Sequence, residues 1–517
     1  MHLHRNDIQN MIKTRFAPSP TGYLHVGGLR TALYSYLFAR KNQGKLVLRI
    51  EDTDQERFVE GAMENLIRTL DIMGIDYDEG VYLEKSVVSD QWSVIEKGDF
   101  GSYIQSKRSG IYKRYAEELL SKGYAYRCFC TKERLEKMRE DQNARKLPPM
   151  YDRKCAYLSE DEIEAEVKKG SSYVIRLKIP QESIIAFDDA IRGHVEFRGY
   201  LIDDQVLMKS DGLPTYHLAN VVDDHLMQIT HVIRGEEWLP STPKHVALYD
   251  AFGWEKPIFA HLPLLLNPDK TKLSKRQGDV AVEDYLAKGY IKEALLNFIA
   301  LLGWNPGTER EIFNLKELTE QFDLSRIQKA GAIFDHAKLD WMNGKYLREM
   351  PIEELAREVF GILKKEDWFH LDINDEYFVE VLKLAKDRMT KFSDAIALMK
   401  FFLVENFDYD TKLFINEKMK VDLEISKTAL AKSLIALEAL NTEDFKNEEK
   451  TKEVLIKVVA NLGLKNGQVL WPIRVALTNE SFSPGVFELL RVMGKERSLE
   501  RMKMAFKLLT TLPTLLN

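Results

Sequence analysis

A strand–turn–helix–strand pattern near the start of the chain constrains its fold more than any other feature. Residues 14–17 predict a short strand, which leads into the turn-forming sequence PSPTG at 18–22. Apolar residues then recur at helical spacing over 26–41, and the apolar run 46–50 has the length of a strand. Two strands joined through a helix pair in parallel, so we predict a βαβ unit within a doubly wound sheet.

The rest of the chain divides into an α/β half and an α-helical half. The segment 124–207 contains short β-like runs, and a second α/β block is expected over 211–266. Beyond residue 281 the apolar spacing is helical almost to the end. With 517 residues the chain is too long for one hydrophobic core, so we expect several domains.

Composition excludes several classes of protein. No apolar run approaches the roughly 18–20 residues that a membrane span needs. The first ten residues are too short and too polar for a secretory signal, and three cysteines cannot supply a disulfide framework. We therefore expect a cytoplasmic protein. The net charge of −6 argues weakly against non-specific nucleic-acid binding, although a local basic face can still bind RNA.

The first candidate site is RFAPSPTGYLHVGG at 15–28, where the predicted strand meets the start of the predicted helix. Unpaired N–H groups and the helix dipole attract phosphate at such a position. Gly27 and Gly28 remove side chains where a nucleotide must approach closely, and His25 can hydrogen-bond phosphate oxygens. Alone, HVGG is a weak signal, because most sequences of four such residues have no function.

The second candidate site is NPDKTKLSKRQGD at 267–279. Two interpretations are open: a solvated basic loop, or a mobile clamp that neutralises charge on a phosphate during its transfer. The segment contains four cationic residues among turn-forming ones: Lys270, Lys272, Lys275 and Arg276.

Together, HVGG at 25–28 and KLSKR at 272–276 match the two signature motifs of class I aminoacyl-tRNA synthetases, in the right order. The chain resembles the bacterial glutamyl-tRNA synthetases over nearly its whole length. The resemblance implies ATP with Mg²⁺ as the energy source, with His25, Lys272, Lys275 and Arg276 as catalytic residues. It implies ATP binding by His25, Gly27, Gly28, Lys272, Ser274 and Lys275. The segments that carry it are 15–33, 48–54, 115–126, 210–245, 267–276 and 339–346.

A pocket selective for L-glutamate needs two cationic partners for the carboxylates and one anion for the ammonium. By resemblance, Arg15 and Arg234 bind the carboxylates and Glu51 binds the ammonium. Which arginine takes which carboxylate stays open, and a structural ion pair is the alternative role for Arg234 or Glu51. The remaining predicted glutamate-binding residues are Ala17, Ser19, Tyr216 and Asn220. The related glutaminyl enzymes carry an acid where Ser19 stands and have a β-barrel C-terminal half, so glutamine is disfavoured as the substrate.

The resemblance implies a Rossmann-like catalytic domain in two halves, 11–106 and 208–266. It implies an α+β connective insertion at 107–207 that holds the acceptor end of tRNA(Glu). A stem-contact region with the KLSKR loop is expected at 267–350, and a helical anticodon-binding region at 351–517. By family position Arg388 reads the third anticodon base. Relatives of this type are commonly monomers, so we expect a monomer.

Two further features leave alternatives open. Cys128, Cys130 and Cys155 suit a structural Zn²⁺ with Tyr157 as the fourth ligand, or they are ordinary buried thiols. The segment 83–99 is longer than in typical relatives, and we expect a surface loop there rather than a functional site.

The expected reaction joins glutamate to tRNA(Glu) and releases AMP and diphosphate. One alternative is a non-discriminating enzyme that also glutamylates tRNA(Gln). A short paralogue that glutamylates a tRNA base is disfavoured, because such proteins lack the helical region beyond residue 350. A catalytically dead synthetase-like RNA-binding protein is disfavoured by the presence of His25, Lys275 and Arg276.

Overall fold

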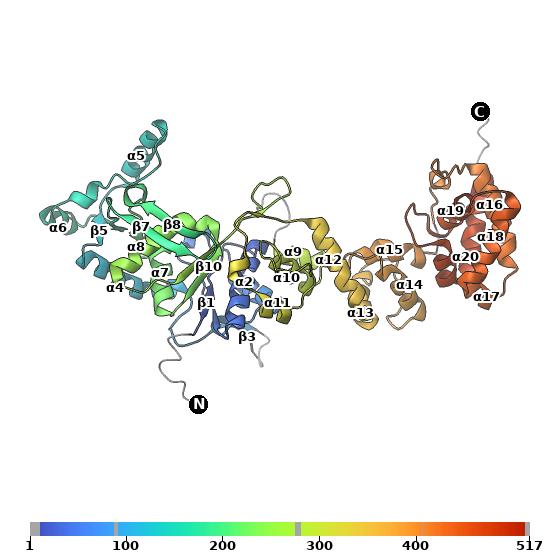
Figure 1. Ribbon diagram of the computed structural model, residues 1–517, viewed down its shortest axis with the longest axis horizontal. Coiled ribbons are helices and arrows are strands. Elements are labelled where there is room, and N and C mark those ends of the chain that lie inside the picture. Colours follow the sequence, from blue (N-terminus) through green and yellow to red (C-terminus); the bar gives the residue numbers. More distant parts are fainter. Residues whose placement is uncertain (1–10, 87–90, 274–280, 406, 512–517) are drawn as a thin grey trace. The chain divides into compact units, whose positions relative to one another are not determined.

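The computed structural model describes residues 11–86, 91–273, 281–405 and 407–511. The chain forms two compact units (Figure 1). The first comprises Met1–Ala287 and Lys292–His336, and the second comprises Lys288–Ile291 and Ala337–Asn517. The first unit is α/β and the second is helical, which confirms the predicted fold class. Within the described ranges, no helix combines the length and apolar character that a membrane span requires.

An eight-stranded sheet organises the first unit. Its central strands run parallel, and each edge ends in an antiparallel pair. The predicted βαβ unit is present as β1, α2 and β2. In spatial order the strands are β4 (Trp92–Lys97), β3 (Glu79–Lys85), β2 (Lys45–Leu48), β1 (Lys13–Phe16), β10 (His231–Gly235), β11 (Ile258–Leu262), β7 (Ile184–Asp189) and β8 (Gly193–Arg198).

The segment predicted as the connective insertion contributes to two sheets. An antiparallel sheet contains β5 (Ala125–Cys128), β6 (Val174–Leu177) and β9 (Val206–Met208). In contrast, β7 and β8 join the edge of the large sheet, where Asp189 of β7 is in register with Phe259 of β11. Part of this segment therefore belongs structurally to the catalytic sheet. A short parallel pair, β12 (Leu265–Leu266) and β13 (Ala332–Ile333), completes the strands of the described residues.

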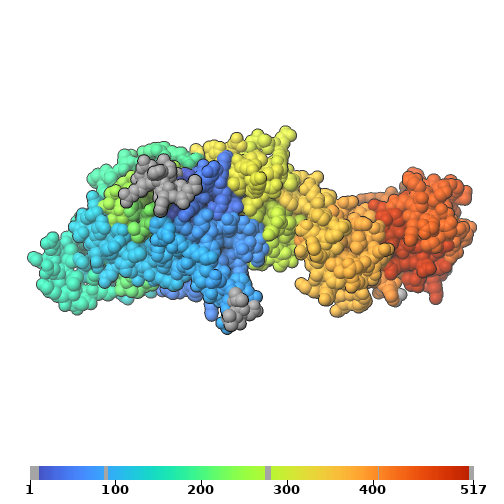
Figure 2. Space-filling view, turned by 90° about the horizontal axis from the view of Figure 1, so that it is seen from below, coloured from blue at the N-terminus to red at the C-terminus, as the bar shows by residue number. Residues whose placement is uncertain are grey.

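The prediction of a surface loop at 83–99 is wrong, because strands β3 and β4 form a β-hairpin there. Strands β3 and β4 pair in antiparallel register from Gly80 with Lys97 to Lys85 with Trp92. Figure 2 shows the light-blue segment that contains this hairpin at the molecular surface. The strand WSVIEK mixes apolar and charged residues, and none of them is fully buried, as is typical of an edge strand in contact with solvent.

Helix α2 (Val26–Lys41) packs against β1, β2 and β10. Its Leu29, Leu33 and Leu37 are fully buried, as the helical spacing predicted. The other helices of the first unit are α3 (Ala62–Ile72), α4 (Ser109–Ser121), α5 (Lys132–Ala144), α6 (Glu160–Lys168), α7 (Tyr216–Leu226), α8 (Thr242–Phe252), α9 (Val282–Ala287), α10 (Lys292–Ala300) and α11 (Leu315–Gln321).

The second unit is built around the long helix α20, which is interrupted by non-helical backbone at Gly494. The buried guanidinium of Arg501 in α20 donates hydrogen bonds to the carbonyls of Leu477 and Val404, at 2.8 and 2.6 Å. It therefore satisfies carbonyl groups that two helix ends leave without partners. The helices are α12 (His336–Glu349), α13 (Ile352–Leu363), α14 (Glu376–Lys386), α15 (Asp394–Leu403), α16 (Leu423–Glu438), α17 (Thr442–Lys446), α18 (Glu448–Leu462), α19 (Asn466–Thr478) and α20 (Val486–Thr511).

Candidate active site

A pocket of about 790 Å³ opens in the first unit at the carboxyl ends of β1 and β10. Such an edge of a parallel sheet is where doubly wound folds bind ligands. Ten residues predicted from the sequence line this one pocket: Arg15, Ala17, Ser19, His25, Gly27, Gly28, Glu51, Tyr216, Asn220 and Arg234.

Backbone pairing brings Glu51 beside the PSPTG turn. The amide of Arg49 donates to the carbonyl of Phe16, and the amide of Glu51 donates to the carbonyl of Pro18, both at 3.0 Å. The parallel pairing of β1 and β2 thus continues past the strand ends into the turn. Two segments more than 30 residues apart are held at one wall of the pocket.

Buried ion pairs fix the floor of the pocket. The Arg15 Nε lies 3.2 Å from an Asp224 carboxylate oxygen. Arg49, which is fully buried, donates to Asp224 at 2.8 Å and to Glu51 at 2.9 Å. Removing Arg49 would take a buried positive partner from both Glu51 and Asp224, which is strongly unfavourable.

Glu51 is the buried anion of the site. Burial raises the pKa of its carboxyl above the ordinary value, while the charge of Arg49 opposes this shift. Its Oε1 also accepts a hydrogen bond from the Asn220 amide at 3.3 Å. Glu51 therefore presents a carboxylate whose orientation is fixed by Arg49 and Asn220, as suits the binding of an ammonium group.

Arg234, at the end of β10, extends from the pocket into the protein interior. Its Nη1 donates to the Tyr216 hydroxyl at 2.7 Å, and its Nη2 donates to Thr242 Oγ1 at 2.8 Å. Burial raises the pKa of the Tyr216 phenol, so this hydroxyl stays neutral. Burial also holds the pKa of His245 well below its usual range, with the Arg234 charge adding to the effect. A neutral His245 ring can lie beside the guanidinium.

The charges of the pocket complement a dicarboxylic amino acid. Arg15 and Arg234 supply two guanidinium groups for the two carboxylates, and Glu51 supplies a carboxylate for the ammonium. Because these groups are held by their neighbours, they are oriented before a ligand arrives.

The start of α2 carries the residues for which phosphate binding is predicted. His25 is the N-cap, and its Nδ1 accepts a hydrogen bond from the Gly27 amide at 2.9 Å. In a neutral ring the proton is therefore assigned to Nε2, which can donate to a phosphate oxygen. A side chain at Gly28 would place its Cβ 3.0 Å from Leu24 Cδ1. Packing inside the protein, as well as room for a nucleotide, thus favours glycine there.

The predicted basic clamp is described only in part. Lys272 is exposed, forms a β-bridge with Leu266 and does not line the pocket. Ser274, Lys275 and Arg276 lie outside the described residues. Their assignment to ATP binding and catalysis stays a prediction.

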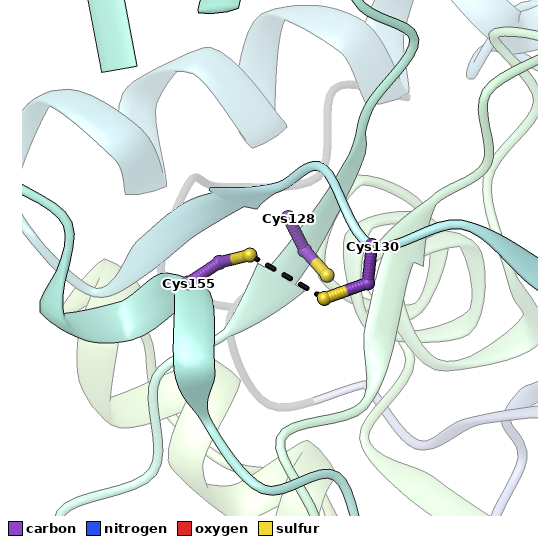
Figure 3. A group of neighbouring side chains, drawn as sticks. All are labelled: Cys128, Cys130 and Cys155. Atoms are coloured by element: carbon purple, nitrogen blue, oxygen red, sulfur yellow. Dashed lines mark hydrogen bonds between the residues drawn. The ribbon is translucent and has the colours of Figure 1, made fainter. Parts of the chain in front are cut away.

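The three cysteines gather into one cluster, in which their sulfur atoms lie within 4.8 Å of one another. Figure 3 shows the thiols of Cys128, Cys130 and Cys155 pointing toward a common centre. Three thiols at this separation are compatible with tetrahedral Zn²⁺, although burial without a metal also explains them. The Tyr151 hydroxyl lies 3.2 Å from Cys130 Sγ and accepts a hydrogen bond from the Cys155 amide at 3.0 Å.

The structure does not place Tyr157, the predicted fourth ligand, beside the thiols. Its side chain is 78% exposed, and the hydroxyl that contacts the thiols belongs to Tyr151. Cys155 and Tyr157 share the 3₁₀ turn Lys154–Tyr157, where residues two apart point in different directions because each turn takes three residues. With Cys155 directed inward, Tyr157 is directed toward solvent.

Arg388 lies in the second unit, just after α14. Its Nη1 donates to the carbonyl of Leu384 at 2.9 Å, and its Nη2 donates to the Glu488 carboxylate at 3.1 Å. Its side chain is 35% exposed, so other donors on the guanidinium can reach a ligand at the surface. Its role in reading tRNA stays a prediction.

Sequence reasoning missed the buried residues that support the pocket. Arg49 and Asp224 lie inside two segments that carried the family resemblance, LRIEDTD and NVVDDH, but nothing distinguished them from surface charges. A charged residue inside the apolar run 46–50 was the available signal for Arg49. Lys209 and Trp238, which also line the pocket, gave no signal by spacing.

The comparisons with known proteins agree with this geometry. The family described as tRNA synthetases class I (E and Q), catalytic domain, matches residues 11–341, and the anticodon binding domain family matches residues 352–506. A glutamate–tRNA ligase of Clostridium botulinum (strain Eklund 17B) is 46% identical, covering 96% of this chain and 99% of that protein. One from Chloroherpeton thalassium is 47% identical, with 96% and 98% covered.

Among solved structures, a glutamate tRNA ligase from Elizabethkingia meningosepticum in complex with its amino acid aligns with a TM-score of 0.83. It is 37% identical, and the alignment covers 97% of this chain and 100% of that one. Both domain families thus occur in the expected order along a chain whose full length has close relatives. The chain belongs to the class I tRNA synthetases for glutamate and glutamine, with their catalytic domain followed by an anticodon-binding domain.

Proposed function

We propose that this protein is a glutamate–tRNA ligase that activates L-glutamate with ATP and transfers it to the 3′ end of tRNA(Glu). The observation that carries the proposal is the convergence of Arg15, Arg234 and Glu51 on one pocket, with the start of α2 at the same pocket. Full-length similarity to glutamate–tRNA ligases supports the same substrate.

In the first step, the α-carboxylate of glutamate attacks the α-phosphorus of ATP. A new phosphorus–oxygen bond forms, the bond to the leaving diphosphate breaks, and glutamyl-adenylate results. Glu51 orients the ammonium, the two arginines bind the carboxylates, and His25 hydrogen-bonds a phosphate oxygen. Mg²⁺ bound with ATP would neutralise part of the phosphate charge.

In the second step, the terminal ribose hydroxyl of tRNA attacks the activated carbonyl and AMP leaves. No protein nucleophile is needed. Catalysis then rests on positioning and on charge stabilisation, to which we also assign Lys272, Lys275 and Arg276 of the basic loop.

We assign acceptor-end binding to 107–207, stem contact to 267–350 and anticodon binding to 351–517, with catalytic halves at 11–106 and 208–266. Arg388 is proposed to read the third anticodon base. We also propose that the cysteine cluster binds structural Zn²⁺, with Tyr151 rather than Tyr157 beside the thiols.

The decisive experiment is aminoacylation of purified tRNA(Glu) and tRNA(Gln) with glutamate, ATP and Mg²⁺. Charging of tRNA(Glu) alone is the expected result and identifies a discriminating enzyme. Charging of both tRNAs would show a non-discriminating enzyme and contradict the role of Arg388. Charging of neither, with an active control synthetase, would overturn the proposed function.

A further inference from the structure

Behind the pocket, a buried chain of hydrogen bonds links Arg234 to a carboxylate from a distant part of the sequence. Arg234 Nε donates to His261 Nε2 at 3.0 Å. On the other side of that ring, His261 Nδ1 lies 2.5 Å from Asp189 Oδ2. The side chains of Asp189 and His261 are fully buried, and neither residue lines the pocket.

The five N–H donors of Arg234 divide between the protein interior and the pocket. On the interior side, Nε donates to His261 and Nη2 donates to Thr242 Oγ1 at 2.8 Å. The hydroxyl of Tyr216, which lines the pocket, accepts from Nη1 at 2.7 Å. The contacts to His245 Nδ1 and the Trp238 carbonyl are longer, both 3.4 Å. These two weaker contacts are the ones that a carboxylate could replace at least cost.

The hydrogen bonds define which nitrogen of His261 carries the proton. An arginine N–H can only donate, so Nε2 must be an acceptor without a proton. The proton of the neutral ring then lies on Nδ1, where it is donated to Asp189. Burial lowers the pKa of His261, although the hydrogen bond to Asp189 opposes this shift, so the ring is neutral near neutral pH.

The Asp189 carboxylate is itself fixed by the turn between β7 and β8. Its Oδ1 accepts hydrogen bonds from the backbone amides of Ile191 at 2.9 Å and Arg192 at 2.8 Å. Oδ2 is therefore directed at His261. Asp189 precedes His261 by 72 residues and belongs to the strand that the connective segment adds to the catalytic sheet.

We propose that Asp189 and His261 are positioning residues, which set the His261 tautomer and thereby hold Arg234 in the orientation that binds a glutamate carboxylate. This inference rests on the proposed function, because it concerns the same pocket. It also gives β7 a role in amino-acid binding, whereas the sequence places that strand in a segment expected to hold tRNA.

The substitution Asp189→Asn tests the tautomer directly. The backbone amides of Ile191 and Arg192 require an oxygen acceptor, so the amide NH₂ of asparagine would face His261 Nδ1. The proton of the ring would then move to Nε2, where it would oppose the N–H of Arg234. Loss of one buried hydrogen bond to a charged group corresponds to a KM for glutamate about tenfold to a hundredfold higher. The KM for ATP is expected to change less than about threefold, because ATP does not contact Arg234 in this scheme.

Three matched variants separate this role from a general effect on folding. Asp188→Asn changes the neighbouring residue, whose carboxylate forms an exposed pair with His194 at 2.8 Å, and should leave both KM values unchanged. Thr242→Val removes the other interior acceptor of Arg234, a hydroxyl that also lies 3.1 Å from His261 Nε2. It should raise the KM for glutamate, and the ring proton should stay on Nδ1 because Asp189 still accepts it. His261→Gln identifies the His261 signals in the spectrum of ¹⁵N-histidine-labelled protein.

The measurements are steady-state aminoacylation and the ¹⁵N shifts of His261 in the wild type and in Asp189→Asn. The expected result is a proton on Nδ1 in the wild type, a proton on Nε2 in Asp189→Asn, and a raised KM for glutamate only. An unchanged tautomer in Asp189→Asn, or equal changes in the KM for glutamate and for ATP, would overturn the inference. Lack of glutamylation by the wild type would overturn the proposed function, and the tautomers would still show whether Asp189 controls the ring.

Discussion

Arg49 and Asp224 lie 2.8 Å apart beneath the candidate glutamate pocket, and both side chains are almost completely shielded from solvent. The same guanidinium binds Glu51 at 2.9 Å, and the same carboxylate binds Arg15 at 3.2 Å. The Arg49–Asp224 pair therefore connects Arg15 and Glu51, to which we assign substrate binding. A substitution of either partner should lower the free energy of unfolding and change the position of these two side chains in the pocket.

We expect Arg49→Met to lower the free energy of unfolding by about 3–5 kcal/mol, because Glu51 and Asp224 lose a buried positive partner. Arg49→Lys should recover only part of this loss, since an ammonium cannot bridge two carboxylates as a planar guanidinium does. Urea denaturation measures both. Arg310→Met is the matched control: its ion pair with Glu317 is exposed, so a change within about 0.5 kcal/mol is expected.

Glu51→Gln should raise the KM for glutamate about tenfold to a hundredfold, because a neutral amide cannot supply the charge that binds the ammonium. The KM for ATP should stay nearly constant. Steady-state aminoacylation at varied glutamate and varied ATP measures the two values. Glu60→Gln, at an exposed position outside the pocket, controls for the loss of a carboxylate. A parallel rise in the KM for ATP would contradict the assignment of Glu51.

Acidification should destabilise the protein through its buried histidines. Burial lowers the pKa of His231 to about 4, so the unfolded chain binds a proton at this residue below about pH 6.5 while the folded chain does not. The stability contribution of His231 is fully present above about pH 6.5. It decreases as the pH is lowered, until His231 also protonates in the folded state near pH 4. Between pH 6 and pH 5, His231 alone should cost about 1 kcal/mol.

The test compares urea denaturation of the wild type and His231→Gln at pH 6 and pH 5. The variant should lose less stability over this interval, because glutamine does not titrate. His370→Gln, at an exposed position, should keep the wild-type pH dependence. Equal slopes for all three proteins would show that His231 does not contribute.

Purified protein should contain one equivalent of zinc, which Cys130→Ser should remove. Tyr151→Phe should weaken retention of the metal during dialysis against a chelator, because the Tyr151 hydroxyl lies 3.2 Å from Cys130 Sγ. Tyr157→Phe should retain zinc as the wild type does, since Tyr157 is 78% exposed. Elemental analysis measures all three. Zinc loss from Tyr157→Phe but not from Tyr151→Phe would reverse our assignment.

Arg388→Gln should lower kcat/KM for tRNA(Glu) by about tenfold or more if Arg388 contacts an anticodon base, since such contacts contribute about 1–3 kcal/mol. In a discriminating enzyme, charging of tRNA(Gln) should rise relative to tRNA(Glu). Arg357→Gln removes an exposed arginine from α13 and should change both tRNAs equally. An unchanged ratio for Arg388→Gln would exclude it as a reader of the anticodon.

Local sequence patterns were sufficient to predict the helix and strands around the pocket. The helix predicted over 26–41 has those bounds in the structure, because its apolar spacing and the preceding proline–glycine turn are local properties. The hairpin of β3 and β4 was missed, since an edge strand with mixed polar residues differs little from a loop in sequence. Its pairing depends on a sheet edge that residues far away in the sequence build.

The sequence by itself determined the family, the order of α/β and helical parts, and most of the residues that line the pocket, because close contact with substrates restricts residue types within short motifs. Only the tertiary structure decided which residues support them. Asp189 meets His261 across 72 positions, and Tyr151 replaces Tyr157 beside the thiols. Such contacts depend on the direction in which a turn or strand presents a side chain, and neither motif spacing nor hydrophobic periodicity encodes a direction between distant segments.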